Sequence, residues 1–91
     1  MIKQVRKLKE KKYRDEKQAF LVEGEKMIQE AISEKAPIEK IFICEECLKD
    51  GSIDQKFIYE IAKQNCVYVG EKIFRSMSDV RTPQGLLAVI R

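Results

Sequence analysis

The chain has 91 residues, of which 44% are hydrophobic, and it carries a formal net charge of +3. A chain of this length buries one core, so one domain over residues 1–91 is expected. No apolar run approaches the ~20 residues of a membrane span, and Lys3, Arg6 and Lys7 interrupt any signal-peptide core. We therefore expect a cytoplasmic protein with no membrane partner.

The residues available for metal or thiol chemistry are few. Three cysteines without a histidine do not supply a standard four-ligand zinc site, and an odd count argues against a disulfide framework, so no metal and reduced thiols are expected. Cys44 and Cys47 have the spacing of a redox CxxC pair, but Glu45 and Glu46 between them are expected to raise the thiol pKa values. A chance spacing at the end of a strand is the favoured interpretation, and a thiol oxidoreductase is the alternative.

The chain begins with a strongly basic segment. Residues 1–17 hold eight basic side chains against three acidic ones. Ile2, Val5 and Leu8 recur every third residue, which predicts one basic helix over residues 1–17. Charge gathered in this way predicts contact with a polyanion, with Tyr13 as a stacking surface among the cations. The alternative is a solvated surface helix with intrahelical ion pairs.

The next stretch, AFLVEGEKMIQEAI at residues 19–32, begins like a buried strand and ends like an amphipathic helix. Between the two, Gly24 allows a partner to approach the backbone closely, and the helix that follows presents free N–H groups. This turn is a candidate contact for a phosphate or a base edge. Lys26 favours an anion, and Glu23 is able to accept hydrogen bonds from a base amino group. The alternative is a glycine that serves packing alone.

The remaining segments continue the alternation of helix and strand. A helix that stops at Pro37 is followed by a strand at 38–44, a loop or helical turn at 45–53, a helix opened by a Ser52/Gln55 capping box, a strand at 66–70, a short helix at 73–77 and a strand at 86–90. This order predicts an α/β fold, a three-layer α/β/α sandwich with a mixed sheet of about four strands.

The turn before the last strand reads TPQG, residues 82–85. Pro83 favours an ordinary β-turn, and Thr82 and Gln84 place two hydrogen-bonding side chains beside it. Without a histidine, a glycine-rich phosphate loop or a nucleophile-base pair, composition and spacing predict no catalytic residue. The strand stops directly at Arg91, which predicts a cut between domains.

Two stretches, RKLKEKKYRDEKQAFLVEGEKMIQEAI and RTPQGLLAVIR, together resemble the N-terminal substrate-binding domain of SpoU/TrmH-type RNA 2′-O-ribose methyltransferases of the SPOUT superfamily. The likeness covers essentially all 91 residues. It implies a fold like that of the kink-turn-binding ribosomal proteins, in which the turn after the first strand touches RNA. It also implies that methyl transfer from S-adenosylmethionine belongs to a separate C-terminal knotted domain that this chain lacks. No cofactor and no activity are therefore expected of this chain alone, although its parent would be an enzyme.

Composition and resemblance together predict RNA binding, with structured ribosomal RNA and the C-terminal methyltransferase domain of the same parent chain as partners. The expected RNA-binding residues are Arg6, Lys7, Lys11, Lys12, Arg14, Glu23, Gly24, Lys26, Thr82 and Gln84. Two alternatives stay open: a protein-interaction or dimerisation module that orients a catalytic domain, and a free-standing small ribosomal-type RNA-binding protein.

Overall fold

The apolar run near the end of the chain forms the central strand of a four-stranded sheet. Strand β4 (Leu86–Ile90) is buried at every position, and it pairs antiparallel with β1 (Phe20–Glu23) on one edge and with β2 (Ile38–Ile43) on the other. Strand β3 (Cys66–Tyr68) pairs parallel to β2, so the strand order is β1-β4-β2-β3. Burial on both faces explains why LLAVI is continuously apolar and does not alternate with polar residues.

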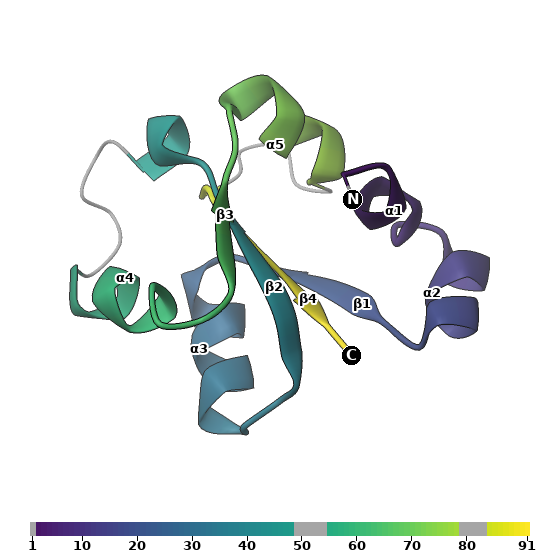
Figure 1. The fold of residues 1–91 in the computed structure, drawn as a ribbon, viewed down its shortest axis with the longest axis horizontal. Helices are drawn as coiled ribbons and strands as arrows, with labels where there is room; N and C mark the ends of the chain where they lie inside the picture. Colours follow the sequence, from purple (N-terminus) through teal and green to yellow (C-terminus); the bar gives the residue numbers. More distant parts are fainter. Residues whose placement is uncertain (1, 49–54, 79–83) are drawn as a thin grey trace.

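Helices cover both faces of this sheet (Figure 1). The computed structural model describes residues 2–48, 55–78 and 84–91. Helices α3 (Glu25–Ser33) and α4 (Gln55–Ile61) lie on one face, here named the α3–α4 face. On the other, the α1–α5 face, lie α1 (Ile2–Lys7), α2 (Lys11–Lys17) and α5 (Glu71–Met77). The predicted three-layer sandwich with a mixed four-stranded sheet is thereby confirmed.

Successive side chains of β4 point to opposite faces and so join two separate cores. Leu86, Ala88 and Ile90 pack in the core of the α3–α4 face, where Ile28 and Ile61 are also buried. Leu87 and Val89 pack in the core of the α1–α5 face, together with Phe42, Phe74 and Met77 from β2 and α5. The period of two along a strand is the reason that one five-residue segment serves both cores.

The basic N-terminal segment bends instead of forming one rod. The single helix predicted over residues 1–17 is wrong, because α1 ends at Lys7 and α2 begins at Lys11. The N–H groups of residues 8–10 donate to carbonyls three residues back, and Glu10 is extended at φ −92° and ψ 128°. A straight helix of this length would extend about 25 Å. The bend keeps Val5, Leu8 and Ala19 on the same core.

The other predicted boundaries hold to within a few residues. Helix α3 ends at Ser33, and Lys35 turns the chain with φ 57° ahead of Pro37. The segment after β2 forms a short 3-10 helix, η1 (Glu45–Leu48). The third strand is shorter than predicted and ends at Tyr68. The capping-box residue Ser52 lies outside the described residues.

Replacing Leu87 by Ala tests the central strand. Leu87 is fully buried, so Leu87→Ala is expected to lower the free energy of unfolding by about 2–5 kcal/mol, through lost burial and the cavity left behind. Urea denaturation followed by circular dichroism measures this change. The control is Ile73→Ala on α5, where the side chain is 42% exposed and the expected change is within about 0.5 kcal/mol. Equal losses in the two variants would contradict the assigned burial.

Candidate nucleic-acid interface

The turn between β1 and α3 is joined by the Gln84 side chain to the residues just before β4. Gln84 Oε1 accepts a hydrogen bond from the backbone N–H of Glu25, at 2.9 Å. That N–H belongs to the first turn of α3, where backbone donors have no partner within the helix. The two segments that the sequence singled out, 59 residues apart, therefore meet in space.

Gly24 is favoured at this junction chiefly by its backbone conformation, because the atom that a Cβ would meet, Gln84 Oε1, is the end of a flexible side chain. Its φ is +91°, a conformation that residues with a Cβ rarely adopt. A Cβ at this position would also lie 2.7 Å from Gln84 Oε1. Its N–H donates to the carbonyl of Leu86 at 3.0 Å, which joins the turn to the start of β4. The sequence left open whether Gly24 serves RNA recognition or packing, and these contacts explain the glycine largely by packing.

Glu23, at the end of β1, is held by the residue that follows α5. Its Oε2 accepts a hydrogen bond from the hydroxyl of Ser78 at 2.7 Å, and Ser78 is buried. The carboxylate is half-buried and fixed in direction. Its role toward a base amino group stays a prediction, and any such contact would use a carboxylate that is already oriented.

The same end of α5 also holds the basic N-terminal segment. Arg6 Nε donates to Ser76 Oγ at 3.0 Å, and Lys9 Nζ donates to the Ser76 carbonyl at 3.0 Å. Because Ser78 contacts Glu23, residues 76–78 connect α1 to the β1–α3 turn. Neither serine was among the predicted site residues, because a serine near the end of a short helix carries no signal that identifies its partners.

The predicted basic residues include exposed lysines and two arginines that make structural hydrogen bonds, Arg6 to Ser76 and Arg14 within the N-terminal segment. Lys7, Lys11 and Lys12 are exposed on α1 and α2, and Lys26 is exposed in the first turn of α3. Arg14 is half-buried, and its Nη1 donates to the carbonyls of Leu8 at 3.0 Å and Lys9 at 2.8 Å. Arg14 therefore fastens the bend between the two helices, a role that a single predicted helix could not show.

Of the TPQG turn, Thr82 lies outside the described residues and Gly85 is tightly enclosed. Gly85 has φ +101°, and a Cβ there would lie 2.8 Å from the Cys44 carbonyl oxygen and 2.9 Å from Cys47 Cβ. The N–H of Cys44 donates to the Gly85 carbonyl at 2.9 Å. Gly85 therefore packs closely on the CxxC segment.

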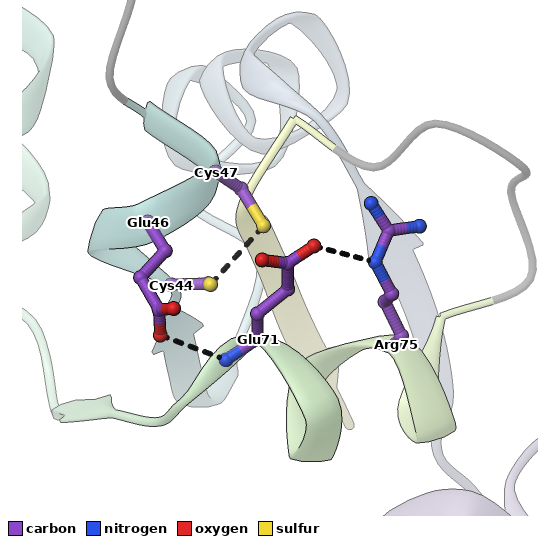
Figure 2. A network of polar contacts seen from close by, with 5 residues as sticks. All are labelled: Cys44, Glu46, Cys47, Glu71 and Arg75. Carbon is purple, nitrogen blue, oxygen red and sulfur yellow. Dashed lines mark hydrogen bonds and ion pairs between the residues drawn. The ribbon is translucent and has the colours of Figure 1, made fainter.

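The two thiols of this segment are close together (Figure 2). Cys47 Sγ lies 3.1 Å from Cys44 Sγ, and burial, followed by the hydrogen bond and charge of Cys44 and then by Glu71, raises the pKa of Cys47 from 9.0 to about 11. The predicted direction of the pKa shift is confirmed for Cys47. Its causes differ from those expected, because neither Glu45 nor Glu46 contributes to it.

Glu46 instead caps a helix. Its Oε1 accepts the backbone N–H of Glu71 at 3.1 Å, at the start of α5, while the Glu71 carboxylate pairs with Arg75 at 2.9 Å (Figure 2). An acidic side chain at a helix N-terminus is favourable because it satisfies a free N–H and faces the positive end of the helix dipole. The CxxC segment thus contacts both Gly85, just before β4, and the start of α5.

The described residues hold neither a metal cluster nor a membrane helix. Over residues 2–48, 55–78 and 84–91, no three side chains of histidine, cysteine, aspartate or glutamate gather in a way that could hold a metal ion. Within the same ranges, no helix has the length and apolarity needed to cross a membrane.

Comparison with known proteins gives a consistent family and fold. The family model described as the MRM3-like substrate binding domain matches residues 1–88. No curated protein matches the chain. Among solved structures, the chain is similar to an RNA 2′-O ribose methyltransferase, with 27% identity and a TM-score of 0.78 over 99% of this chain and 33% of that one.

Two further solved proteins share this fold over nearly the whole of this chain and about a third of their own. A Porphyromonas gingivalis protein described as an RNA methyltransferase of the TrmH family has 28% identity and a TM-score of 0.70, over 98% of this chain and 33% of that one. An rRNA methyltransferase from Sinorhizobium meliloti has 23% identity and a TM-score of 0.72, over 99% and 32%, a likeness that shows the fold alone. The chain spans about a third of the length of these proteins.

The Gln84 hydrogen bond predicts a measurable contribution to stability. Gln84→Ala is expected to lower the free energy of unfolding by about 0.5–1.5 kcal/mol, because the Glu25 N–H loses its acceptor. Urea denaturation measures the loss. Gln64→Ala, at another exposed glutamine, serves as the matched control and is expected to change stability by less than about 0.5 kcal/mol. An unchanged midpoint for Gln84→Ala would show that this bond does not stabilise the turn.

The raised pKa of Cys47 predicts slow alkylation of the folded chain. The folded thiol ionises near pH 11, whereas the thiol of the unfolded chain ionises near 9.0, so at neutral pH the folded chain holds far less thiolate. Iodoacetamide labelling of Cys47, followed by mass spectrometry, is expected to be at least about tenfold slower than in urea, and to accelerate as the pH rises toward 11. Cys44→Ser should recover part of the rate. Equal rates in folded and unfolded chains would refute the shift.

Proposed function

Because the chain belongs to the MRM3-like substrate-binding domain family, we propose that it recognises the RNA substrate of a SpoU/TrmH-type RNA 2′-O-ribose methyltransferase. The proposed substrate is structured ribosomal RNA, and the proposed location is the cytoplasm. Two neighbours above 25% identity are described as an RNA 2′-O ribose methyltransferase and as an RNA methyltransferase of the TrmH family, which supports this substrate class.

The observation that carries the proposal is the run of exposed cations on α1 and α2. Lys7, Lys11 and Lys12 are exposed on these two short helices. The contacts of Arg6 and Lys9 to Ser76 hold this segment to α5, and Arg14 fixes the bend between α1 and α2. Cations held on a folded surface neutralise phosphates and release counterions, which is the main source of sequence-independent affinity for nucleic acid.

The β1–α3 turn supplies the second part of the proposed surface. Gly24 precedes the first turn of α3, and Lys26 stands exposed in that turn. Glu23 and Gln84 place polar side chains at this end of the sheet, and Glu23 is held by Ser78 while Gln84 is held by the Glu25 N–H. In this proposal the lysines supply affinity, while the turn supplies discrimination through base edges or backbone shape. Thr82 belongs to the same proposal.

Methyl transfer is not assigned to this chain. We propose that S-adenosylmethionine and the catalytic residues belong to a C-terminal domain of a longer parent chain, and that this catalytic domain is the second partner of residues 1–91. The substrate-binding domain would then contribute binding energy and orientation, which lower a reaction barrier when they place the reacting groups correctly.

The test is a titration with ribosomal RNA fragments at several salt concentrations. Lys11→Ala/Lys12→Ala is expected to weaken binding about tenfold at low salt, and to reduce the slope of log K against log salt by about 0.7–0.9 for each phosphate that is no longer neutralised. Circular dichroism should show an unchanged fold, because both side chains are exposed.

The matched control removes the same charge from the opposite face. Lys56→Ala/Lys63→Ala changes two exposed lysines on and just after α4, and it is expected to leave RNA affinity within about twofold of the unmodified chain. Equal weakening by both double variants would contradict a localised surface. No RNA binding by the unmodified chain at low salt would favour the interaction-module alternative. Tight RNA binding whose affinity does not change when a catalytic domain is added would favour a free-standing small ribosomal-type RNA-binding protein.

A further inference from the structure

The α1–α5 face contains a cavity of about 490 Å³, and none of the ten predicted RNA-binding residues lines it. It lies between the N-terminal helices and the sheet, at the end where β1 begins and β4 finishes. The register pairs Phe20 with Ile90 at this end and Glu23 with Leu87 at the other, so the cavity and the β1–α3 turn lie at opposite ends of β1. Its volume falls within the range of about 300–1,000 Å³ that small-ligand sites occupy.

The floor of the cavity is apolar. Val5, Leu8, Phe42 and Val89 line it, and each is at most 5% exposed. These side chains belong to the core of the α1–α5 face, so the floor is formed by packed elements of α1, β2 and β4. An apolar floor suits the face of a planar ring more than it suits a phosphate.

One aromatic side chain lines the cavity, and two lysine ammonium groups lie over its ring. Tyr13 of α2 lines the cavity, and the ammonium groups of Lys7 and Lys17 each lie 5.7 Å from the centre of its ring. An aromatic ring next to lysines is the arrangement that nucleic-acid-binding proteins use to stack a base while holding its phosphate.

The rim is built by the ends of β4 and α2 and by an irregularity in β2. Arg91 pairs with Glu39 at 2.7 Å and donates to the Lys17 carbonyl at 3.2 Å, which connects three elements around the opening. The register of β2 against β4 shifts between Ile38 and Lys40, so Glu39 stands at the irregular position. Such irregularities re-aim a side chain and frequently border functional sites.

The rim is also electropositive and able to hydrogen-bond. The cavity is lined by three basic side chains, Lys17, Lys40 and Arg91, and by the carboxylate of Glu39. The Glu39 carboxylate is paired with Arg91. The amide of Asn65 also lines the opening and donates to the Glu39 carbonyl at 3.1 Å. The surplus of positive charge favours an occupant that carries phosphate.

We propose that this cavity holds one unstacked nucleobase of the bound RNA, with its ring against Tyr13 and its phosphate near the lysines. The proposal rests on the proposed function, since it names a base-binding site for the same RNA. It adds a second contact region at the far end of the sheet from the β1–α3 turn. Single-stranded and bulged bases are the parts of RNA that proteins reach most readily in this way.

The experiment uses an RNA hairpin with a bulge that carries one 2-aminopurine, a base whose fluorescence falls on stacking. The unmodified chain is expected to quench this fluorescence on binding. Tyr13→Ala should weaken binding by about fivefold to a hundredfold and remove the quenching, whereas Tyr13→Phe retains the ring and should retain both. Tyr59→Ala is the matched control, because Tyr59 is an exposed tyrosine on α4 that also has a lysine beside its ring, and it should change neither.

A second variant covers the case in which Tyr13→Ala unfolds the chain. Ala19 is buried and lines the cavity, so Ala19→Leu fills the space while keeping Tyr13 and every charge. It should abolish quenching and weaken binding while the urea midpoint does not fall. Normal quenching with Ala19→Leu would overturn the proposal.

The outcomes separate this proposal from the proposed function. Full affinity with unchanged quenching in folded Tyr13→Ala would overturn the base site and leave RNA recognition standing. If the unmodified chain binds no RNA at low salt, the proposed RNA recognition is refuted. A titration with adenosine, cytidine, guanosine and uridine monophosphates, followed by NMR, then tests whether the cavity binds a nucleotide. Shifts at Leu8 and Val89 that Ala19→Leu abolishes would support a nucleotide site, and no shifts would overturn it.

Discussion

Hydrogen bonding of β4 on both of its edges is the constraint on which the rest of this domain depends. The strand pairs with β1 and β2 at once and contributes alternate side chains to both cores, so neither helix layer has a complete core without it. The residues before β4 must therefore arrive beside the end of β1. This is why Gln84 reaches Glu25 of the β1–α3 turn, 59 residues away in the sequence, and why Gly85 reaches the CxxC segment.

Two glycines make that close approach possible. Gly24 and Gly85 both have positive φ, and each lies where a Cβ would come within 3 Å of a neighbouring atom. Gly24 faces the Gln84 side chain, while Gly85 faces the backbone of Cys44 and the Cβ of Cys47. The CxxC spacing has a structural explanation here, because η1 packs closely against Gly85 and its Glu46 caps α5. Raised pKa values at Cys47 and Cys66 agree with thiols that pack and do not react.

The basic segment connects two ends of one sheet. Helix α1 is held to the end of α5, which contacts Glu23 at the β1–α3 turn, while α2 leads to the start of β1 beside the Tyr13 cavity. An RNA lying along the exposed lysines of these helices would meet the turn at one end and the cavity at the other. This layout matches a domain whose task is to fix the position of a long ligand, since contacts at separated points constrain orientation better than contacts at one.

The sequence alone determined the elements, their order and the layered fold, because hydrophobic periodicity and turn residues are local properties of the chain. It also located the cations and the two segments that form the β1–α3 junction. The tertiary structure decided the bend at residues 8–10, where burying Val5, Leu8 and Ala19 in one core outweighed continuation of the helix. It also decided that Arg14 is structural, that Ser76 and Ser78 join α1 to Glu23, and that a cavity opens beside Tyr13. These features depend on contacts between residues far apart in the chain, for which local patterns carry no information.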